Sequence, residues 1–186
     1  MINIIATGML LMSAFSCYAE VTSAQNFCQR LNSNLSTEYI QDGKKAHCQQ
    51  SSINWFDGVT AFEHYAAPVT FEPEGKADFH VLILSPKWSN AYDVSSSTLI
   101  EQLDSKGLNS RFTLFNYQGN EAQAQAIVKA AERNSVDLIY SMGSSTTAFI
   151  SDFYRGGSLP VVSVCSKDPI SMGLIDPVLD VSQSNI

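Results

Sequence analysis

The residues best suited to hold a ligand lie where a short apolar stretch meets a glycine and a run of hydroxyl side chains. Residues 136–141 read as a strand, Gly143 interrupts it, and Ser144, Ser145 and Thr146 follow. Small hydroxyl residues favour the first turn of a helix, where backbone N–H groups have no partner within the helix. Such a helix start is a ready site for an anionic group such as a carboxylate. The same residues also serve as ordinary helix caps, so both roles stay open.

Two other places in the chain supply candidate ligand-binding residues. Ser85 and Trp88 follow the apolar run of residues 79–84, and Tyr92 comes shortly after them. Trp88 and Tyr92 are suited to stacking on an aromatic ligand, or else to packing on the N-terminal segment. Asp168 follows a later apolar run and suits the ammonium group of an amino acid, or else a turn before a proline.

The sequence gives little support to catalysis or to a cofactor. The three histidines precede most of the candidate site, and His80 falls at the start of a strand, so no Ser-His-Asp set can be argued. The glycines form neither a GxGxxG fingerprint nor a phosphate-binding loop. A metal site built from Cys28, His47 and Cys48, with His64 as a fourth ligand, has no tightly spaced ligand pair. We therefore expect a binding protein without metal or other cofactor, and not an enzyme.

Length and composition fit one domain of ordinary size. The chain has 186 residues, of which 45% are hydrophobic, and this is enough for a real core. Its 11 basic and 18 acidic residues give a formal net charge of -7, and the basic residues are scattered, without a basic stripe. We expect the acidity to serve solubility, and we expect no nucleic-acid partner.

The N-terminus reads as a signal peptide for export. Residues 1–19 carry no charged side chain, and residues 4–15 form an apolar run too short to span a bilayer. Cys17 and Ala19 are small residues that suit cleavage after Ala19. A lipid anchor at Cys17 is the alternative, which fits less well because Phe15 is bulky where a small residue is wanted. Export predicts a periplasmic location.

The remaining cysteines fit an exported protein. Cys28 and Cys48 are then the natural disulfide pair, closing a loop of about 20 residues worth roughly 3 kcal/mol. Cys165 stands at the end of an apolar run, where we expect a buried free thiol.

Residues 20–77 form a poorly patterned extension before the main domain. Residues 24–35 suit a short helix, residues 41–45 suit a turn, and residues 53–65 hold aromatic side chains that can dock on a neighbour. Without the disulfide, such a segment has too little core of its own, so we expect it to pack on the main domain rather than fold alone.

Strand and helix patterns alternate in the main domain, residues 78–186. The first strand, residues 79–84, is a near-continuous apolar run, as in a strand covered on both faces, whereas the second is shorter and reads as nearer an edge. Asn120 caps the second helix, whose apolar face is Ala124, Ile127, Val128 and Ala131. The pattern predicts strands at residues 79–84, 111–115, 137–141 and 159–164, with helices at residues 94–106, after Asn120, and at residues 145–154.

This alternation predicts an α/β fold with a parallel sheet between two layers of helices, joined by right-handed crossovers. The carboxyl ends of the strands then gather at one edge of the sheet. That edge collects residues 85–88, 116–118, 143–146 and 166–168.

Three stretches in this domain resemble a known family. They are Asp137 to Ala148 with its Gly-Ser-Ser-Thr helix start, Leu159-Pro160-Val161-Val162, and Ser166 to Leu174 with its Asp-Pro and Gly-Leu pairs. Together they resemble the substrate-binding proteins of ABC importers with a type I periplasmic-binding-protein fold, in particular the group for aromatic amino acids and related small solutes. The similarity covers residues 79–175, and the Asp-Pro and Gly-Leu element is its more specific part.

The resemblance implies a flavodoxin-like lobe that binds an amino acid or similar small solute in a cleft between two lobes. It implies an ABC permease of the inner membrane as partner. Only the N-terminal lobe is expected here, with the second lobe absent, as in a fragment, a truncated gene or a single-lobe protein. The alternative function is the periplasmic sensory domain of a signalling protein.

Overall fold

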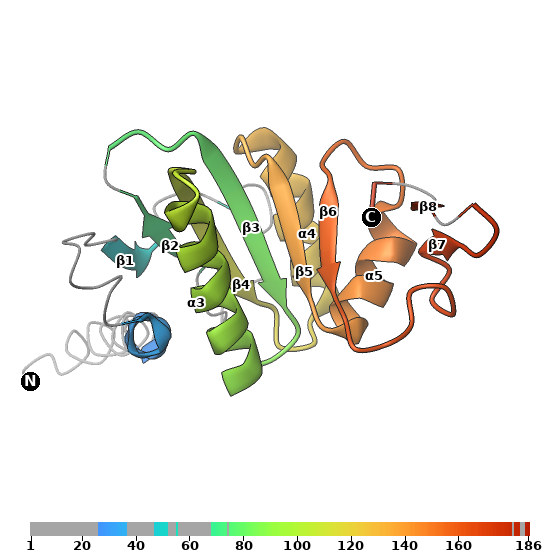
Figure 1. The fold of residues 1–186 in the computed structure, drawn as a ribbon, viewed down its shortest axis with the longest axis horizontal. Coiled ribbons are helices and arrows are strands. Elements are labelled where there is room, and N and C mark those ends of the chain that lie inside the picture. Colours follow the sequence, from blue (N-terminus) through green and yellow to red (C-terminus); the bar gives the residue numbers. More distant parts are fainter. Residues whose placement is uncertain are drawn as a thin grey trace, which may run out of the picture.

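The computed structural model describes residues 26–36, 47–51, 55, 68–73, 75–179, 181–182 and 185–186. These residues form a mixed α/β unit around a six-stranded, mostly parallel sheet (Figure 1). Within these ranges, no helix is both long and apolar enough to cross a membrane. The α/β class predicted from the sequence is confirmed.

The sheet joins four parallel strands to two antiparallel strands at one side. Its spatial order is β1-β2-β4-β3-β5-β6, so β3 is central. All four predicted strands are present, with ends that differ from the prediction by two residues or fewer. The parallel strands are β3 (Phe79–Ser85), β4 (Ser110–Asn116), β5 (Leu138–Met142) and β6 (Val161–Val164), and the antiparallel ones are β1 (His47–Gln50) and β2 (Val69–Glu72). A separate small ladder follows, formed by β7 (Ile175–Asp176) and β8 (Val181–Ser182).

Three helices connect the parallel strands and cover both faces of the sheet. Helix α3 (Asn90–Ser105) leads from β3 to β4 on one face, whereas α4 (Glu121–Arg133) and α5 (Ser144–Tyr154) lie on the other (Figure 1). Each crossover is right-handed, so the direction in which the chain moves across the sheet decides which face of the sheet the connecting helix covers. The chain moves from β3 outward to β4 and then back past β3 to β5, so the face changes once, between β3 and β5.

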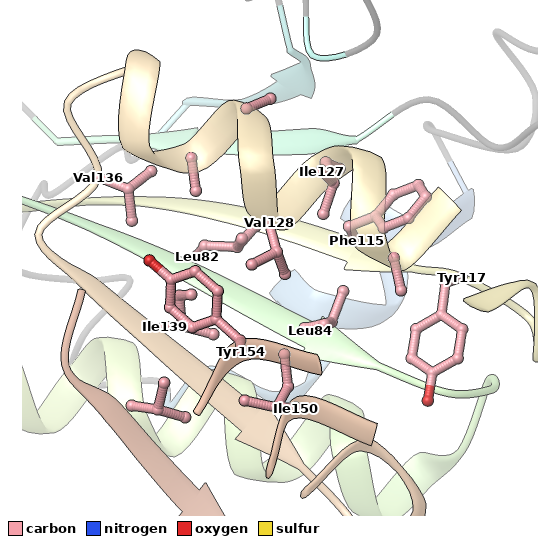
Figure 2. Close-up of a cluster of buried hydrophobic side chains, with 14 of the residues drawn as sticks. Leu82, Leu84, Phe115, Tyr117, Ile127, Val128, Val136, Ile139, Ile150 and Tyr154 are labelled. Atoms are coloured by element: carbon pink, nitrogen blue, oxygen red, sulfur yellow. The ribbon is translucent and has the colours of Figure 1, made fainter. Parts of the chain in front are cut away.

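The α4 and α5 face of the sheet is packed by one apolar cluster (Figure 2). The side-chain oxygen of Asn120 accepts a hydrogen bond from the backbone N–H of Gln123 and so caps α4, as predicted. The predicted apolar face of α4 is fully buried. Each aliphatic side chain taken out of water contributes about 1.5–3 kcal/mol. The cluster includes Leu82, Leu84, Ala124, Ile127, Val128, Ala131, Ile139 and Ile150.

A second apolar cluster covers the opposite face beneath α3. There Ile100 of α3 belongs to one buried cluster with Val81 and Ile83 of the central strand, together with Phe112 of β4. All four residues from Val81 to Leu84 are no more than 3% exposed, so β3 is buried on both faces as its sequence predicts.

The N-terminal extension joins this second cluster. Residues 26–34 are helical, inside the predicted range, and Phe27 and Leu31 are buried there. The predicted disulfide between Cys28 and Cys48 is present and ties this helix to β1. The expectation that the extension packs on the main domain is confirmed.

One expectation about the sheet is wrong. Residues 111–115 were expected near an edge, but β4 is interior because β2 pairs antiparallel with it, Val69 opposite Leu114, and β1 pairs in turn with β2. The extension thus supplies the outer strands.

Three other expectations change or lie outside the described residues. Helix α3 starts at Asn90, a turn before the predicted residue 94, so Tyr92 is helical. Cys165 is a free thiol as expected, but it is partly exposed and not buried. The predicted turn at residues 41–45 lies outside the described residues, and of residues 53–65 only Trp55 is described, 2% exposed.

Replacing Cys28 and Cys48 together by serine is expected to lower the free energy of unfolding by about 2–4 kcal/mol, because the unfolded chain loses a constraint. Urea unfolding followed by circular dichroism measures this. Cys165→Ser is the matched control and should change stability by less than about 0.5 kcal/mol. An equal loss in the control would contradict the assignment of the disulfide as the stabilising element.

His80 gives the fold a pH dependence. Its ring lies edge-on to Trp55, with centroids 5.9 Å apart, and its Nε2 lies 2.8 Å from Thr113 Oγ1. Burial, followed by the positive charge of Arg111, lowers the pKa of His80 below its usual value. The folded protein therefore holds His80 neutral.

We expect the melting temperature to fall as the pH drops below about 6.5, because the unfolded chain then binds a proton that folded His80 does not. The stability that neutral His80 provides is present above pH 6.5 and is lost as pH falls toward the lowered folded-state pKa. Scanning calorimetry from pH 7.5 to 5 measures the slope. His80→Gln should flatten it, and an unchanged slope in that variant would assign the effect to other groups.

Candidate functional site

An open pocket of about 590 Å³ lies at the carboxyl edge of the parallel strands, between β3 and β5. The face of the sheet that receives the helices changes at this boundary, and open α/β sheets bind ligands in the crevice that such a change creates. The lining comes from the loop after β3 and the start of α3, the end of β5 and start of α5, and the segment after β6. It consists of Pro86, Lys87, Ala91, Tyr92, Ser95, Met142, Gly143, Ser144, Ser145, Val164, Cys165, Ser166 and Lys167.

The first turn of α5 presents hydrogen-bond donors at this pocket. Gly143 is the N-cap residue, and its carbonyl oxygen accepts from Thr147 N–H at 3.0 Å. In the part of the chain that the structure describes, no residue accepts from the N–H groups of Ser144, Ser145 or Thr146. These amides and the positive end of the helix dipole favour an anion.

The charges around the pocket have the sign that an anion requires. Lys87 and Lys167 are part of the lining, and no aspartate or glutamate is among the lining residues. Both lysines are exposed. In a chain with a formal net charge of -7, this edge is a local exception. The arrangement suits a carboxylate or another small anionic group.

The pocket depends on a close contact between Tyr92 and Gly143. A Cβ atom at Gly143 would lie 2.3 Å from the Tyr92 hydroxyl oxygen, and the backbone φ angle of Gly143 is +84°. A glycine is required here for two reasons, the left-handed backbone and the lack of room. The ring of Tyr92 consequently lies directly against the strand-to-helix turn.

The three candidate hydroxyl residues of α5 separate into two groups. Ser144 and Ser145 line the pocket, and Ser144 Oγ lies 3.4 Å from Ser166 Oγ. Thr146 is 0% exposed, and its hydroxyl lies 3.2 Å from the hydroxyl of buried Tyr117. Burial raises the pKa of Tyr117, so this contact is between neutral groups. The side chain of Thr146 therefore belongs to the core. Its backbone N–H is the only group of Thr146 that is available at the start of the helix.

Trp88 lies outside the pocket lining and contacts the extension. Its ring centroid is 4.9 Å from that of Phe27, and the guanidinium carbon of Arg30 lies 4.5 Å above it. Arg30 Nε also donates to the carboxylate of buried Asp93 at 3.1 Å. Of the two roles considered for Trp88, packing on the N-terminal segment is the one that the structure shows.

Ser85 and Asp168 take up positions beside the pocket. Ser85, at the end of β3, lines a second and much smaller cavity. The side-chain oxygen of Asp168 accepts from Ser171 N–H at 2.8 Å, and its carbonyl oxygen accepts from Ser171 Oγ at 2.8 Å. Asp168 thus forms the turn considered for it, and it is not part of the pocket lining.

Several lining residues were not singled out from the sequence. Lys87 stands two residues beyond the end of β3, and Lys167 stands three residues beyond the end of β6. Their shared position just past the end of a strand was the sequence signal that could have identified both lysines as site residues. Ser95 was not named as a candidate, and Cys165 was missed because it was expected in the interior.

A metal site finds no support in the described residues. There, no group of three or more His, Cys, Asp or Glu side chains could hold a metal ion. Cys28 and Cys48 are bonded to each other, which removes two of the four ligands considered. His64 lies outside the described residues.

No family model matches this sequence, and the search of curated proteins found no match. A solved structure that matches is the ligand-free, open structure of CD0873, a substrate binding protein with adhesive properties from Clostridium difficile. The match has a TM-score of 0.48 and 19% sequence identity, and it covers 57% of this chain and 37% of that chain. This chain thus matches little more than a third of that protein's length. The functional proposal rests on the pocket's own residues.

Gly143→Ala is expected to destabilise the protein more than Gly119→Ala. Both glycines have positive φ angles, but a Cβ at Gly119 meets nothing within 4 Å. We expect about 1 kcal/mol for Gly119→Ala and at least about 1 kcal/mol more for Gly143→Ala, from the clash with Tyr92. Tyr92→Phe should recover part of the excess, because the hydroxyl oxygen is the nearest atom. Equal losses at both glycines, measured by urea unfolding, would rule out the close contact.

Proposed function

We propose that this chain is a solute-binding unit that takes a small organic anion in the pocket between β3 and β5. The observation that carries the proposal is the start of α5, which presents unpaired backbone amides to a pocket containing Lys87 and Lys167 and no acidic side chain. A volume of about 590 Å³ is in the range of small-molecule sites. A carboxylate matches these donors in both charge and hydrogen bonding.

The pocket favours the carboxylate end of an amino-acid ligand over its ammonium end. Asp168, considered as the ammonium partner, accepts from Ser171 N–H with one of its two side-chain oxygens and is not part of the lining. The lining offers the hydroxyl groups of Ser95, Ser144 and Ser166 instead. The residues that line this pocket therefore recognise the anionic group of the solute. A cationic group on the same solute needs hydrogen-bond acceptors that lie outside this lining.

Transport by an ABC importer is the proposed context, with a permease of the inner membrane as partner and the periplasm as location. The disulfide between Cys28 and Cys48 supports an oxidising compartment, since structural disulfides persist outside the reducing cytosol. The resemblance of residues 137–174 to importer-associated binding proteins supports the same context. Binding without chemical conversion is the proposed activity.

Small carboxylates and amino acids are expected to raise the melting temperature of the protein, since a ligand that binds the folded state stabilises it. Isothermal titration at low salt then gives the affinity of the best solute. Lys87→Ala and Lys167→Ala should each weaken binding about two- to five-fold, and added salt should reduce the difference.

Lys106→Ala is the matched control for these two variants. Lys106 follows α3 at the opposite edge of the sheet, so its removal changes the net charge equally but not the charge at the pocket. Equal weakening in all three variants would mean a general charge effect. No response to any carboxylate or amino acid would overturn the proposal.

A further inference from the structure

A second cavity, of about 20 Å³, lies next to the main pocket. Tyr92 and Lys87 line both spaces, so the two adjoin at these side chains. The small cavity lies under the start of α3, next to the ends of β3 and β4, and its polar lining includes Ser85, Asp93 and Asn116. About 10–15 Å³ is enough for one water molecule, so the cavity can hold a single small polar group.

Asn116 brings an unused hydrogen-bond donor to this cavity. The side chain is 6% exposed, and its Nδ2 has no hydrogen-bond partner among the described residues. Its Oδ1 accepts from Gln118 N–H at 3.0 Å, which fixes the orientation of the amide and leaves Nδ2 as the end available to the cavity. A buried donor without a partner is unfavourable, so the site calls for an acceptor oxygen.

Two other polar groups around the cavity are already engaged. Asp93 accepts a hydrogen bond from Arg30 Nε, and Ser96 Oγ donates one to the carbonyl oxygen of Tyr92 at 2.8 Å. Asn116 Nδ2 is a buried donor of this lining without a partner, and it calls for an acceptor. A neutral oxygen suits this donor better than a second carboxylate, because Asp93 already places a negative charge there.

Tyr92 is suited to control access between the two spaces. Its hydroxyl lies against Gly143, and the described residues provide that hydroxyl with no hydrogen bond. The ring is held by packing alone, on a side chain that is only partly buried. A rotation about its side-chain bonds would join the cavity to the main pocket without breaking a polar contact.

We propose that the cavity behind Tyr92 is a second compartment of the solute site, in which the Asn116 amide binds a hydroxyl or carbonyl oxygen of the solute. This inference rests on the proposed anion site at α5. The solute class is then a hydroxy or keto carboxylate. Its anionic group binds the backbone amides of residues 144–146, and its second oxygen accepts a hydrogen bond from Asn116. Tyr92 is the residue that sets the permitted distance between the two groups, and a water molecule fills the compartment when no solute is bound.

Nuclear magnetic resonance of the full, ¹⁵N-labelled chain tests this with two matched series of probes. The hydroxy acids are glycolate, 3-hydroxypropionate and 4-hydroxybutyrate, and the simple acids are acetate, propionate and butyrate. Both series should shift the backbone amide signals of residues 144–146. One length of hydroxy acid should also shift the Asn116 side-chain signals and bind about five-fold more tightly than its matched simple acid, the value of one neutral hydrogen bond.

Two variants of Tyr92 examine the role of the ring. Tyr92→Ala removes the partition, so hydroxy acids of more than one length should shift the Asn116 signals. Tyr92→Phe keeps the ring and should keep the preference for one length. If both variants show the same length preference as the unchanged protein, Tyr92 does not set the distance and that part of the proposal is wrong.

Different results would disprove the anion site and the second compartment. Shifts at residues 144–146 without any response of Asn116, in the unchanged protein and in Tyr92→Ala, would mean that the cavity holds water alone. That outcome overturns the second compartment and leaves the proposed function intact. No shift at residues 144–146 with any acid would overturn the anion site and the second compartment together.

Discussion

The desolvation of β3 is the constraint on which the rest of the structure depends. A parallel strand whose residues Val81 to Leu84 are buried on both faces must have helices above and below it. Helix α3 covers one face, and α4 with α5 covers the other, which requires the chain to change direction across the sheet between β3 and β5. The need to cover both faces of β3 therefore forms the core and also creates the crevice at the strand ends. Fold and pocket have one physical cause.

The elements that could be predicted from the sequence are those with strong local patterns. The apolar run of β3 and the spaced aliphatic residues of α4, capped by Asn120, have no reasonable alternative to a buried strand and an amphipathic helix. The pairing of β2 with β4 could not be predicted, because it depends on contacts between residues more than 40 positions apart, such as Val69 and Leu114, and β2 has only four residues. Local propensity carries little information about such pairing.

The candidate site was predictable in place but not in detail. The Gly143 turn could be recognised from residue types, whereas the sequence does not fix which hydroxyl groups face outward. A helix turns about 100° per residue, so adjacent Ser145 and Thr146 end on different sides, one exposed and one buried. Lys87 and Lys167 lie in the segments predicted to gather at this edge, but the sequence does not distinguish them from solvated loop charges. For Trp88, the deciding partners, Phe27 and Arg30, lie about 60 residues earlier in the chain.

The antiparallel attachment of β2 also has a consequence for the order in which the protein assembles. β2 precedes in the chain the strand β4 with which it pairs, so it must wait through synthesis until residues 110–116 have emerged. The disulfide has no such dependence, since Cys28 and Cys48 are 20 positions apart and both come before β2. It can close while the sheet does not yet exist. The covalent link therefore holds the helix of residues 26–34 and β1 together independently of the pairing of β2 with β4.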